Sequence, residues 1–321
     1  MIRAILNKLF WGLYRHFASD EQYARARYRL NTGRKLRLDP PVTLSEKINW
    51  IKLNDRSELR KIVADRTGVR QFVEDRIGSE HLIPLIGVYD ELSREIWNGL
   101  PPQFVLKANH GSGMVKVVHD KKLEDPDEII QLTREWQQTD YSGFGREWVY
   151  KDLPRTIVAE ELLLTENGRV PEDYKFFCFD GKAVLFQIDF DRYGEHTRNF
   201  YDRSLNQADA KIIYEPNEQQ IVLPGNLQEA FRLADRLSKG FDFIRVDLYL
   251  MPNRVLFGEM TNFPGNGFEA FSPYGEYDFL DQDKFLRIFD AILNDAAESV
   301  SRKFKVRKQI LIDKFNTIFE R

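Results

Sequence analysis

Two neighbouring segments near the C-terminal third of the chain decide the fold. They read Phe243-Ile244-Arg245-Val246-Asp247-Leu248-Tyr249-Leu250 and Arg254-Val255-Leu256-Phe257-Gly258-Glu259. Both have strand-like alternation, and Pro252-Asn253 between them is a turn signal. The alternation places Arg245, Asp247 and Tyr249 on one face and the aliphatic residues on the other. The sequence therefore predicts an antiparallel pair of strands in which Asp247 and Glu259 lie close together.

Two carboxylates on paired strands repel each other unless a cation or a proton intervenes. One interpretation is a Mg²⁺ site, because Mg²⁺ takes hard oxygen ligands and leaves room for water and nucleotide phosphates. The other is a solvated sheet face on which Asp247 forms a salt bridge with Arg245. These residues alone favour neither interpretation.

The surrounding sequence alternates between strand and helix signals. Thr43 with Glu46 three residues later predicts a helix start, and Asp180-Gly181 predicts a hairpin between strands 173–179 and 183–190. Further strands are expected at 104–107, 114–118 and 156–160, and helices at 43–53, 57–76, 125–139, 226–237 and 282–319. The fold class is α+β, with antiparallel sheets supported by helices.

Composition excludes several classes of protein. Of 321 residues, 42% are hydrophobic and 24 are Phe, which argues against disorder. The single cysteine, Cys178, excludes a disulfide framework and is expected in the core. Lys and Arg number 47 against 50 Asp and Glu, so no basic excess supports nucleic-acid binding. No segment reaches the roughly 18 uninterrupted apolar residues of a membrane span.

A glycine-containing loop, Asn109-His110-Gly111-Ser112-Gly113, follows a short strand that ends at Lys107. Glycines allow backbone N–H groups to approach phosphate oxygens, Ser112 adds a hydroxyl donor and Lys107 a point charge. A plain hairpin turn is the alternative. His110 either contacts phosphate or packs within the loop.

In their order, these motifs resemble the ATP-grasp superfamily, and more narrowly its TupA-like branch. The resemblance spans about residues 30 to 280. It is carried by 44–48, 82–89, 104–107 with 109–113, 158–163, 173–176, 199–202, 245–249 with 257–259, and Pro264-Gly265.

The resemblance implies an ATP-grasp fold in which two antiparallel-sheet subdomains clasp ATP. Lys107 would contact the α-phosphate side of the nucleotide, and the glycine loop would close over the β- and γ-phosphates. The remaining nucleotide-binding positions are Glu160, Glu161 and Leu163 at the adenine hinge, Asp173 toward the ribose, and Lys175.

The resemblance also implies that Asp247 and Glu259 hold Mg²⁺ and that Arg245 clamps a phosphate or an acyl phosphate. Lys107 and Arg245 are thus the catalytic candidates. The superfamily often has Glu-x-Asn, but here Thr261 holds the third position and Asn262 follows it. Ligand chemistry favours Asn262 as the third ligand, and the spacing to Pro264 favours Thr261. Asp65-Arg66 stands where Asp-Lys is common.

The implied activity is that of an ATP- and Mg²⁺-dependent carboxylate–amine ligase of surface polysaccharide biosynthesis. It would join an amino acid to a sugar or glycan carboxylate, such as that of a uronic acid, through an acyl phosphate. Three alternatives stay open. These are a kinase acting on a sugar or glycan, a glycosyltransferase using Asp189 and Asp191, and a binding module without activity.

The expected organisation has four parts. A helical region, 1–95, precedes a lid subdomain with the glycine loop, 96–165, a core subdomain with the metal site, 166–281, and a helical segment, 282–321. The protein is expected to be cytoplasmic. An amphipathic helix at 2–17 and a basic segment at 302–308 would suit a peripheral contact with the inner face of the membrane. Packing of the N-terminal helix on the body of the protein is the alternative.

Overall fold

The computed structural model describes residues 18–269 except 192, 193, 209 and 220. The chain divides into two compact units. Of the described residues, the first unit contains those up to Glu172 and those from Tyr249 on, and the second contains Asp173–Leu248. The helices expected at 2–17 and 282–319, and the basic segment 302–308, lie outside the described residues.

Helices begin the first unit: α3 (Asp20–Thr32), α4 (Leu44–Asn54), α5 (Glu58–Ala64) and α6 (Gly68–Ile77). The predicted helix start at Thr43 is confirmed, because Thr43 and Glu46 form a reciprocal capping box. The single helix predicted at 57–76 is wrong, since α5 ends at Ala64 and α6 starts four residues later. Asp65 causes the break, because its carboxylate accepts hydrogen bonds from the backbone of Thr67 and Gly68.

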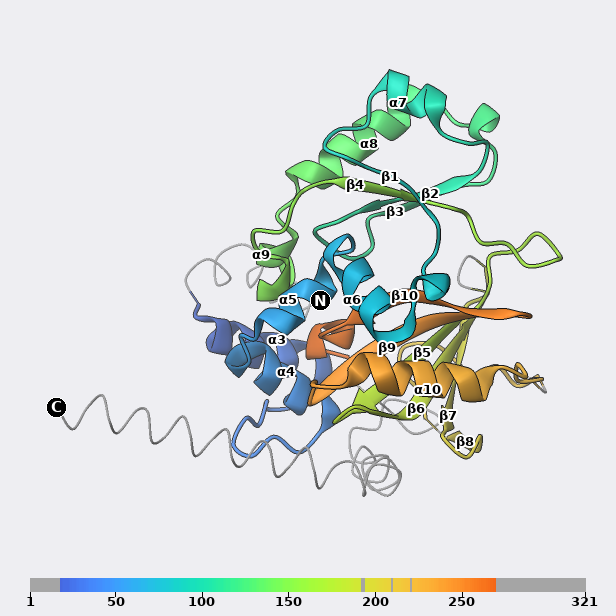
Figure 1. Ribbon diagram of the computed structural model, residues 1–321. Coiled ribbons are helices and arrows are strands. Elements are labelled where there is room, and N and C mark those ends of the chain that lie inside the picture. Colours follow the sequence, from blue (N-terminus) through green and yellow to red (C-terminus); the bar gives the residue numbers. More distant parts are fainter. Residues whose placement is uncertain (1–17, 192–193, 209, 220, 270–321) are drawn as a thin grey trace. The chain divides into compact units, whose positions relative to one another are not determined.

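A four-stranded sheet follows these helices in the first unit. It consists of β1 (Leu85–Tyr89), β4 (Ile157–Glu160), β2 (Phe104–Ala108) and β3 (Val115–Val118) in this order, and each neighbouring pair is antiparallel. Helices α7 (Arg94–Gly99) and α8 (Pro126–Gln138) cover one face (Figure 1). Trp97, Ile129 and Ile130 from these helices pack there against Leu106 and Ala159.

The alternation of strand residues then fixes what the second face of this sheet carries. Lys107 follows Leu106, and Glu160 follows Ala159, so their side chains point away from the helix-covered core. Strand β1 lies within the stretch 1–95 for which the sequence predicts mostly helix. Pro84 and Gly87 interrupt the helical pattern at this point.

The second sheet has the order β10-β9-β5-β6-β7-β8. Its strands are β5 (Asp173–Phe179), β6 (Lys182–Phe190), β7 (Thr197–Asp202), β8 (Gln207–Ala208), β9 (Phe243–Met251) and β10 (Arg254–Thr261). The hairpin predicted at Asp180-Gly181 is confirmed, and both residues have positive φ, 49° and 78°, as a tight primed turn requires. Helix α10 (Leu227–Ser238) packs Phe231 edge-on against Phe176 of β5 and Phe186 of β6.

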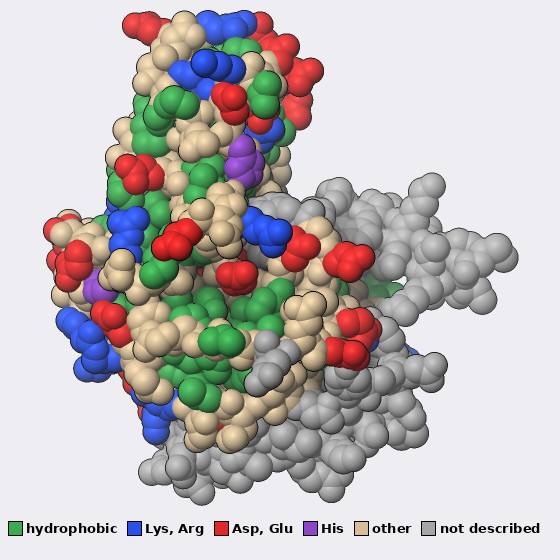
Figure 2. All heavy atoms as spheres, turned by 90° about the vertical axis from the view of Figure 1, so that its right-hand side faces the viewer, with side chains coloured by type: hydrophobic (Ala, Val, Ile, Leu, Met, Phe, Trp, Pro, Cys, Tyr) green, Lys and Arg blue, Asp and Glu red, His purple; other side chains and the backbone are tan. Residues whose placement is uncertain are grey.

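Short helices complete the described chain. They are η2 (Ser79–His81), η3 (Lys121–Leu123), α9 (Tyr141–Gly145), η4 (Trp148–Tyr150) and η5 (Pro264–Gly267). Among the described residues, no helix is long and apolar enough to cross a membrane. On the face shown in Figure 2, basic and acidic side chains are interspersed and do not gather into one basic field.

Candidate functional site

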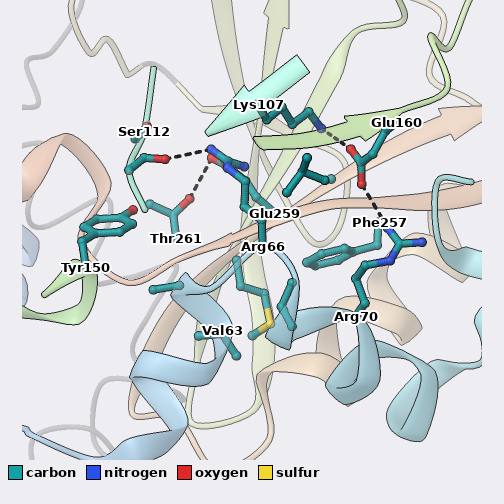
Figure 3. A pocket seen from close by; sticks show the side chains of 16 residues that line it. Val63, Arg66, Arg70, Lys107, Ser112, Tyr150, Glu160, Phe257, Glu259 and Thr261 are labelled. Carbon is teal, nitrogen blue, oxygen red and sulfur yellow. Dashed lines mark hydrogen bonds and ion pairs between the residues drawn. The ribbon is translucent and has the colours of Figure 1, made fainter. Parts of the chain in front are cut away.

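A hollow in the first unit brings together four of the charged residues singled out from the sequence: Arg66, Lys107, Glu160 and Glu259. It is lined by segments from α5, α6, β2, the glycine loop, β4, η4 and β10 (Figure 3). Three cationic side chains face two carboxylates there: Arg66, Arg70 and Lys107 against Glu160 and Glu259. This imbalance favours an anionic ligand.

The Lys107 ammonium is held by Glu160. Its Nζ lies 2.6 Å from Glu160 Oε2, and Arg70 Nη1 donates to Glu160 Oε1 at 3.0 Å. The side chains of Lys107, Glu160 and Arg70 are 14%, 12% and 19% exposed. The structure thus brings two of the predicted nucleotide-binding residues together and adds Arg70, which the sequence interpretation did not single out.

The glycine loop is tied down by Arg66. The Arg66 guanidinium donates from Nε to Ala108 O at 3.0 Å and from Nη2 to Gly111 O at 3.1 Å. Gly111 has to be a glycine, because a Cβ there would lie 2.8 Å from the ring of Tyr141. Gly111 and Ser112 line the hollow. Gly113, which has φ of +77°, completes the turn without lining it.

His110 packs within the loop. It is 3% exposed, and its Nε2 pairs with Trp136 O at 2.9 Å. Burial lowers the pKa of His110, which favours its neutral form. Of the two roles left open for His110, the structure favours loop packing.

Glu259 of β10 enters the same hollow with a side chain that is 37% exposed. Its Oε1 accepts a hydrogen bond from Thr261 Oγ1 at 3.1 Å, and its Oε2 lies 3.6 Å from Arg66 Nη1. Asn262 is 4% exposed, and both ends of its amide engage Arg60: Oδ1 with Nη1 at 3.2 Å and Nδ2 with the carbonyl at 2.9 Å. Thr261 is therefore better placed than Asn262 to join Glu259 at a metal, and the identity of the third ligand stays a prediction.

A second charged cluster lies on the sheet of the second unit, centred on Lys175. The Lys175 ammonium lies 3.1 Å from Asp173 Oδ2, 3.1 Å from Asp247 Oδ2 and 3.8 Å from Asp189 Oδ2. Arg245 forms two hydrogen bonds with Asp247, each 2.7 Å long. Asp247 is 1% exposed, so its carboxylate is buried and surrounded by cations.

Arg198 neutralises the third carboxylate of this cluster, Asp189, through a 2.5 Å hydrogen bond from its Nε. Burial acts to raise the pKa of Asp189, but the hydrogen bond and charge of Arg198 and the charge of Lys175 outweigh it and lower the pKa to about 2. Asp191 is exposed and adopts φ of +46° just after β6. The two aspartates proposed for a glycosyltransferase therefore do not form an open pair of ligands.

These contacts answer part of the question that the sequence left open about Asp247. The expected salt bridge with Arg245 is present, but the sheet face around Asp247 is buried instead of solvated. Asp247 belongs to the second unit and Glu259 to the first, so the predicted metal pair stays a prediction. Within the described residues, no group of three or more His, Cys, Asp or Glu side chains could hold a metal ion.

The remaining predicted residues lie at the end of β4 and the start of β5. The Glu161 N–H donates to Pro84 O at 3.0 Å, and Leu163 packs with Ile83 and Leu256. Asp173 is 4% exposed and paired with Lys175. None of these contacts tests the adenine and ribose roles, which stay predictions.

Sequence reasoning also missed two buried groups of opposite charge in the first unit, Lys52 and Glu147. Burial lowers the pKa of Lys52 to about 7 and raises the pKa of Glu147 to about 7, each against the influence of the other's charge. The Lys52 ammonium donates to the backbone carbonyl of Asn266 at 2.8 Å and also to its side-chain oxygen. Nothing in the local pattern around Lys52 marks it as buried.

Comparison with known proteins gives one family. The model of the TupA-like ATPgrasp family matches residues 46–286. A search of the curated proteins gives no match. Similar solved structures include a D-alanine–D-alanine ligase from Bacillus anthracis, with 18% identity, 77% of this chain and 69% of that chain covered, and a TM-score of 0.44.

Two more of the similar structures are also enzymes. One is N5-carboxyaminoimidazole synthase from Aspergillus clavatus, at 12% identity, covering 64% of this chain and 45% of that one, with a TM-score of 0.34. The other is the ATP-grasp ligase PsnB, at 10% identity, covering 68% of this chain and 60% of that one, with a TM-score of 0.38.

Proposed function

Because the chain belongs to the TupA-like ATP-grasp family and is an ATP-grasp ligase enzyme, we propose that it joins an amino acid to a uronic-acid carboxylate of a surface polysaccharide. The observation that carries the nucleotide half of this proposal is the hollow in the first unit. Lys107, the glycine loop and Glu259, which the sequence assigns separately to phosphates and metal, line this one space.

In the proposed reaction, the carboxylate is first phosphorylated and the acyl phosphate then reacts with the amine. A carboxylate oxygen of the sugar attacks the γ-phosphorus of ATP, the bond to the bridging oxygen breaks, and ADP leaves. The amine nitrogen of the amino acid then attacks the acyl carbon, orthophosphate leaves, and the amine proton passes to solvent. The protein supplies positioning and charge neutralisation for both steps.

In this scheme each residue of the hollow has a separate task. Lys107 neutralises phosphate charge after it exchanges Glu160 for the nucleotide, and the backbone of Gly111 and Ser112 covers the phosphates. Arg66 keeps that loop in place through its two bonds to backbone carbonyls.

The residues present fit a magnesium ion. Glu259 is accessible in the hollow and already accepts a hydrogen bond from the Thr261 hydroxyl, so hard oxygen donors converge there. Glu259 and Thr261 of the first unit would hold the ion, and the role of Asp247 as a metal ligand stays a prediction. A bound Mg²⁺ would neutralise charge on the phosphate oxygens.

The test is a product analysis with ATP, Mg²⁺ and a panel of uronic acids and amino acids. A uronic acid labelled with ¹⁸O in its carboxylate should transfer one label to orthophosphate, and ADP should form in equal amount. Glu259→Gln should abolish this transfer. A stable phosphorylated sugar without orthophosphate would identify a kinase and overturn the ligase proposal.

The polysaccharide context and the membrane contact belong to the same proposal. They are supported by the family and by the basic, amphipathic character of residues 2–17 and 302–308. Co-sedimentation of the full chain with anionic vesicles at low salt tests the contact. Absence of the protein from the vesicle pellet would refute it.

A further inference from the structure

The carboxylate of Glu160 is shared between two cations of different kinds. Oε2 accepts from the Lys107 ammonium at 2.6 Å, and Oε1 accepts from Arg70 Nη1 at 3.0 Å (Figure 3). Lys107 comes from β2, Glu160 from the neighbouring strand β4, and Arg70 from helix α6. The three side chains are mostly buried, so their charges interact with little screening.

This arrangement sets a condition for any nucleotide that is to use Lys107. The ammonium has to leave Glu160 before it can reach a phosphate oxygen. A buried carboxylate that loses its only cation is strongly destabilised, because neither solvent nor a partner then compensates its charge. With Arg70 in place, Glu160 keeps one charge-assisted hydrogen bond after Lys107 has moved.

The two cations differ in how freely they can move. Arg70 is fixed at a second point, because its Nη2 donates to the backbone carbonyl of Ile83 at 2.9 Å. Its planar guanidinium therefore spans Glu160 and the segment that leads into β1. Lys107 carries a point charge on a flexible four-carbon stem, and among the described residues its Nζ forms a hydrogen bond and ion pair with Glu160 alone. Lys107 is the side chain that can turn toward a ligand while Arg70 stays.

We propose that Arg70 is a positioning residue that keeps Glu160 neutralised while Lys107 passes from Glu160 to a nucleotide phosphate. This inference rests on the proposed function, since it presumes that ATP binds in the hollow. It assigns Arg70 no contact with the nucleotide. Arg70 acts through Glu160, so its effect on the affinity for ATP should disappear when Glu160 has no carboxylate.

That dependence gives a double-mutant cycle as the test, read out as the dissociation constant for ATP in calorimetry. Arg70→Met alone should weaken binding about ten- to hundredfold, the effect of one charge-assisted hydrogen bond. In a Glu160→Gln background Lys107 is no longer held by a charge, so the same Arg70→Met change should alter affinity less than about twofold. Arg70→Lys keeps the positive charge but not the two-point contact, so it should restore only part of the lost affinity.

Arg203 offers a matched control in the second unit. Like Arg70, it bridges a carboxylate and a backbone carbonyl: Asp235 at 2.8 and 2.9 Å and Ala183 O at 2.7 Å. Arg203→Met should lower the melting temperature and leave ATP affinity unchanged. Circular dichroism and melting temperatures of all variants separate loss of fold from loss of binding.

Two results would overturn this inference but leave the proposed function standing. Equal losses of affinity in the wild-type and Glu160→Gln backgrounds would show that Arg70 acts independently of Glu160, for example by touching the phosphates itself. A fall in melting temperature with unchanged affinity would show a purely structural role. If the wild-type chain does not bind ATP at all, the proposed function fails and the inference fails with it.

Discussion

Replacement of Asp247 by Asn tests whether this carboxylate is part of the core or of the reacting site. Its two oxygens receive three charge-assisted contacts, two of 2.7 Å from Arg245 and one of 3.1 Å from Lys175. Asn offers one neutral oxygen and turns an N–H₂ group toward these cations. Removal of one partner from a buried charge network costs about 3 to 5 kcal/mol. The melting temperature should therefore fall by roughly 5 to 15 °C.

Glu259→Gln is the matched comparison, since it changes the other predicted metal carboxylate by the same atoms. The Glu259 side chain is 37% exposed, its ion pair with Arg66 is 3.6 Å long, and Gln can still accept from Thr261. The free energy of unfolding of the Glu259→Gln variant should differ from that of the wild type by less than about 0.5 kcal/mol. Both variants should lose turnover by orders of magnitude.

Urea unfolding followed by circular dichroism, together with ADP release, measures both effects. The expected pattern is equal loss of turnover with unequal loss of stability. If Asp247→Asn unfolds at the same urea concentration as the wild type, the buried network does not stabilise the fold in the way these contacts imply. If Glu259→Gln keeps normal ADP release at low Mg²⁺, Glu259 is not a metal ligand.

Four further outcomes are expected. Lys107→Met should raise the dissociation constant for ATP about ten- to hundredfold in calorimetry, and unchanged affinity would exclude Lys107 from the nucleotide site. Thr261→Ala should raise the Mg²⁺ concentration needed for half-maximal turnover, whereas Asn262→Ala should lower the melting temperature without this shift; the opposite pattern would make Asn262 the ligand. Burial raises the pKa of Glu147 from its ordinary value of 4.5 to about 7. Its contribution to the free energy of unfolding is therefore complete below pH 4.5 and falls with a measurable slope as the pH rises through 7. Glu147→Gln should flatten that slope in urea titrations, and an unaltered slope would contradict the raised pKa. Burial raises the pKa of the Cys178 thiol well above its usual range, so Cys178 should react with a thiol reagent only after unfolding; rapid reaction of the native protein would contradict this.

The parts of the fold that the sequence predicts well are those with a local physical cause. Asp180-Gly181 specifies a primed turn because both positions need positive φ, and the hairpin of β5 and β6 follows from it. The side chains of Thr43 and Glu46 each accept a hydrogen bond from the other's backbone N–H, so these two residues alone predict the start of α4. Such signals do not depend on distant parts of the chain.

The helix break at Asp65 shows why a local pattern can also mislead. The apolar spacing across residues 57–76 suits one continuous helix, and Ile62 is then expected in its buried face. The carboxylate of Asp65 instead caps the next helix, and the change of helical phase leaves Ile62 38% exposed. The same break turns Arg66 toward the hollow.

Charge partners across the sheets are what sequence reasoning could not supply. Repulsion between Asp247 and Glu259 predicts that a neutral replacement of either leaves the folded protein intact. Asp247 in fact pairs with Lys175, which is 72 positions away, and Arg245 supplies a second cation. The sign of the expected stability change is thereby reversed for Asp247, because the replacement removes an attraction. The pairing of Lys175 with Asp247 depends on how strand β5 lies beside β9, which no local sequence pattern specifies.

The hollow of the first unit and the Lys175 cluster share one electrostatic principle. The two catalytic candidates from the sequence are already paired with carboxylates of the protein, Lys107 with Glu160 and Arg245 with Asp247, and Arg66 in the hollow is paired with Glu259. If the proposed function holds, a ligand phosphate would have to replace a carboxylate as the partner of each of these cations. The net gain is the difference between two ion pairs, which is smaller than the strength of either. A residue that stays bonded to the carboxylate after the lysine has left it, as we propose for Arg70 and Glu160, would therefore affect nucleotide affinity without touching the nucleotide.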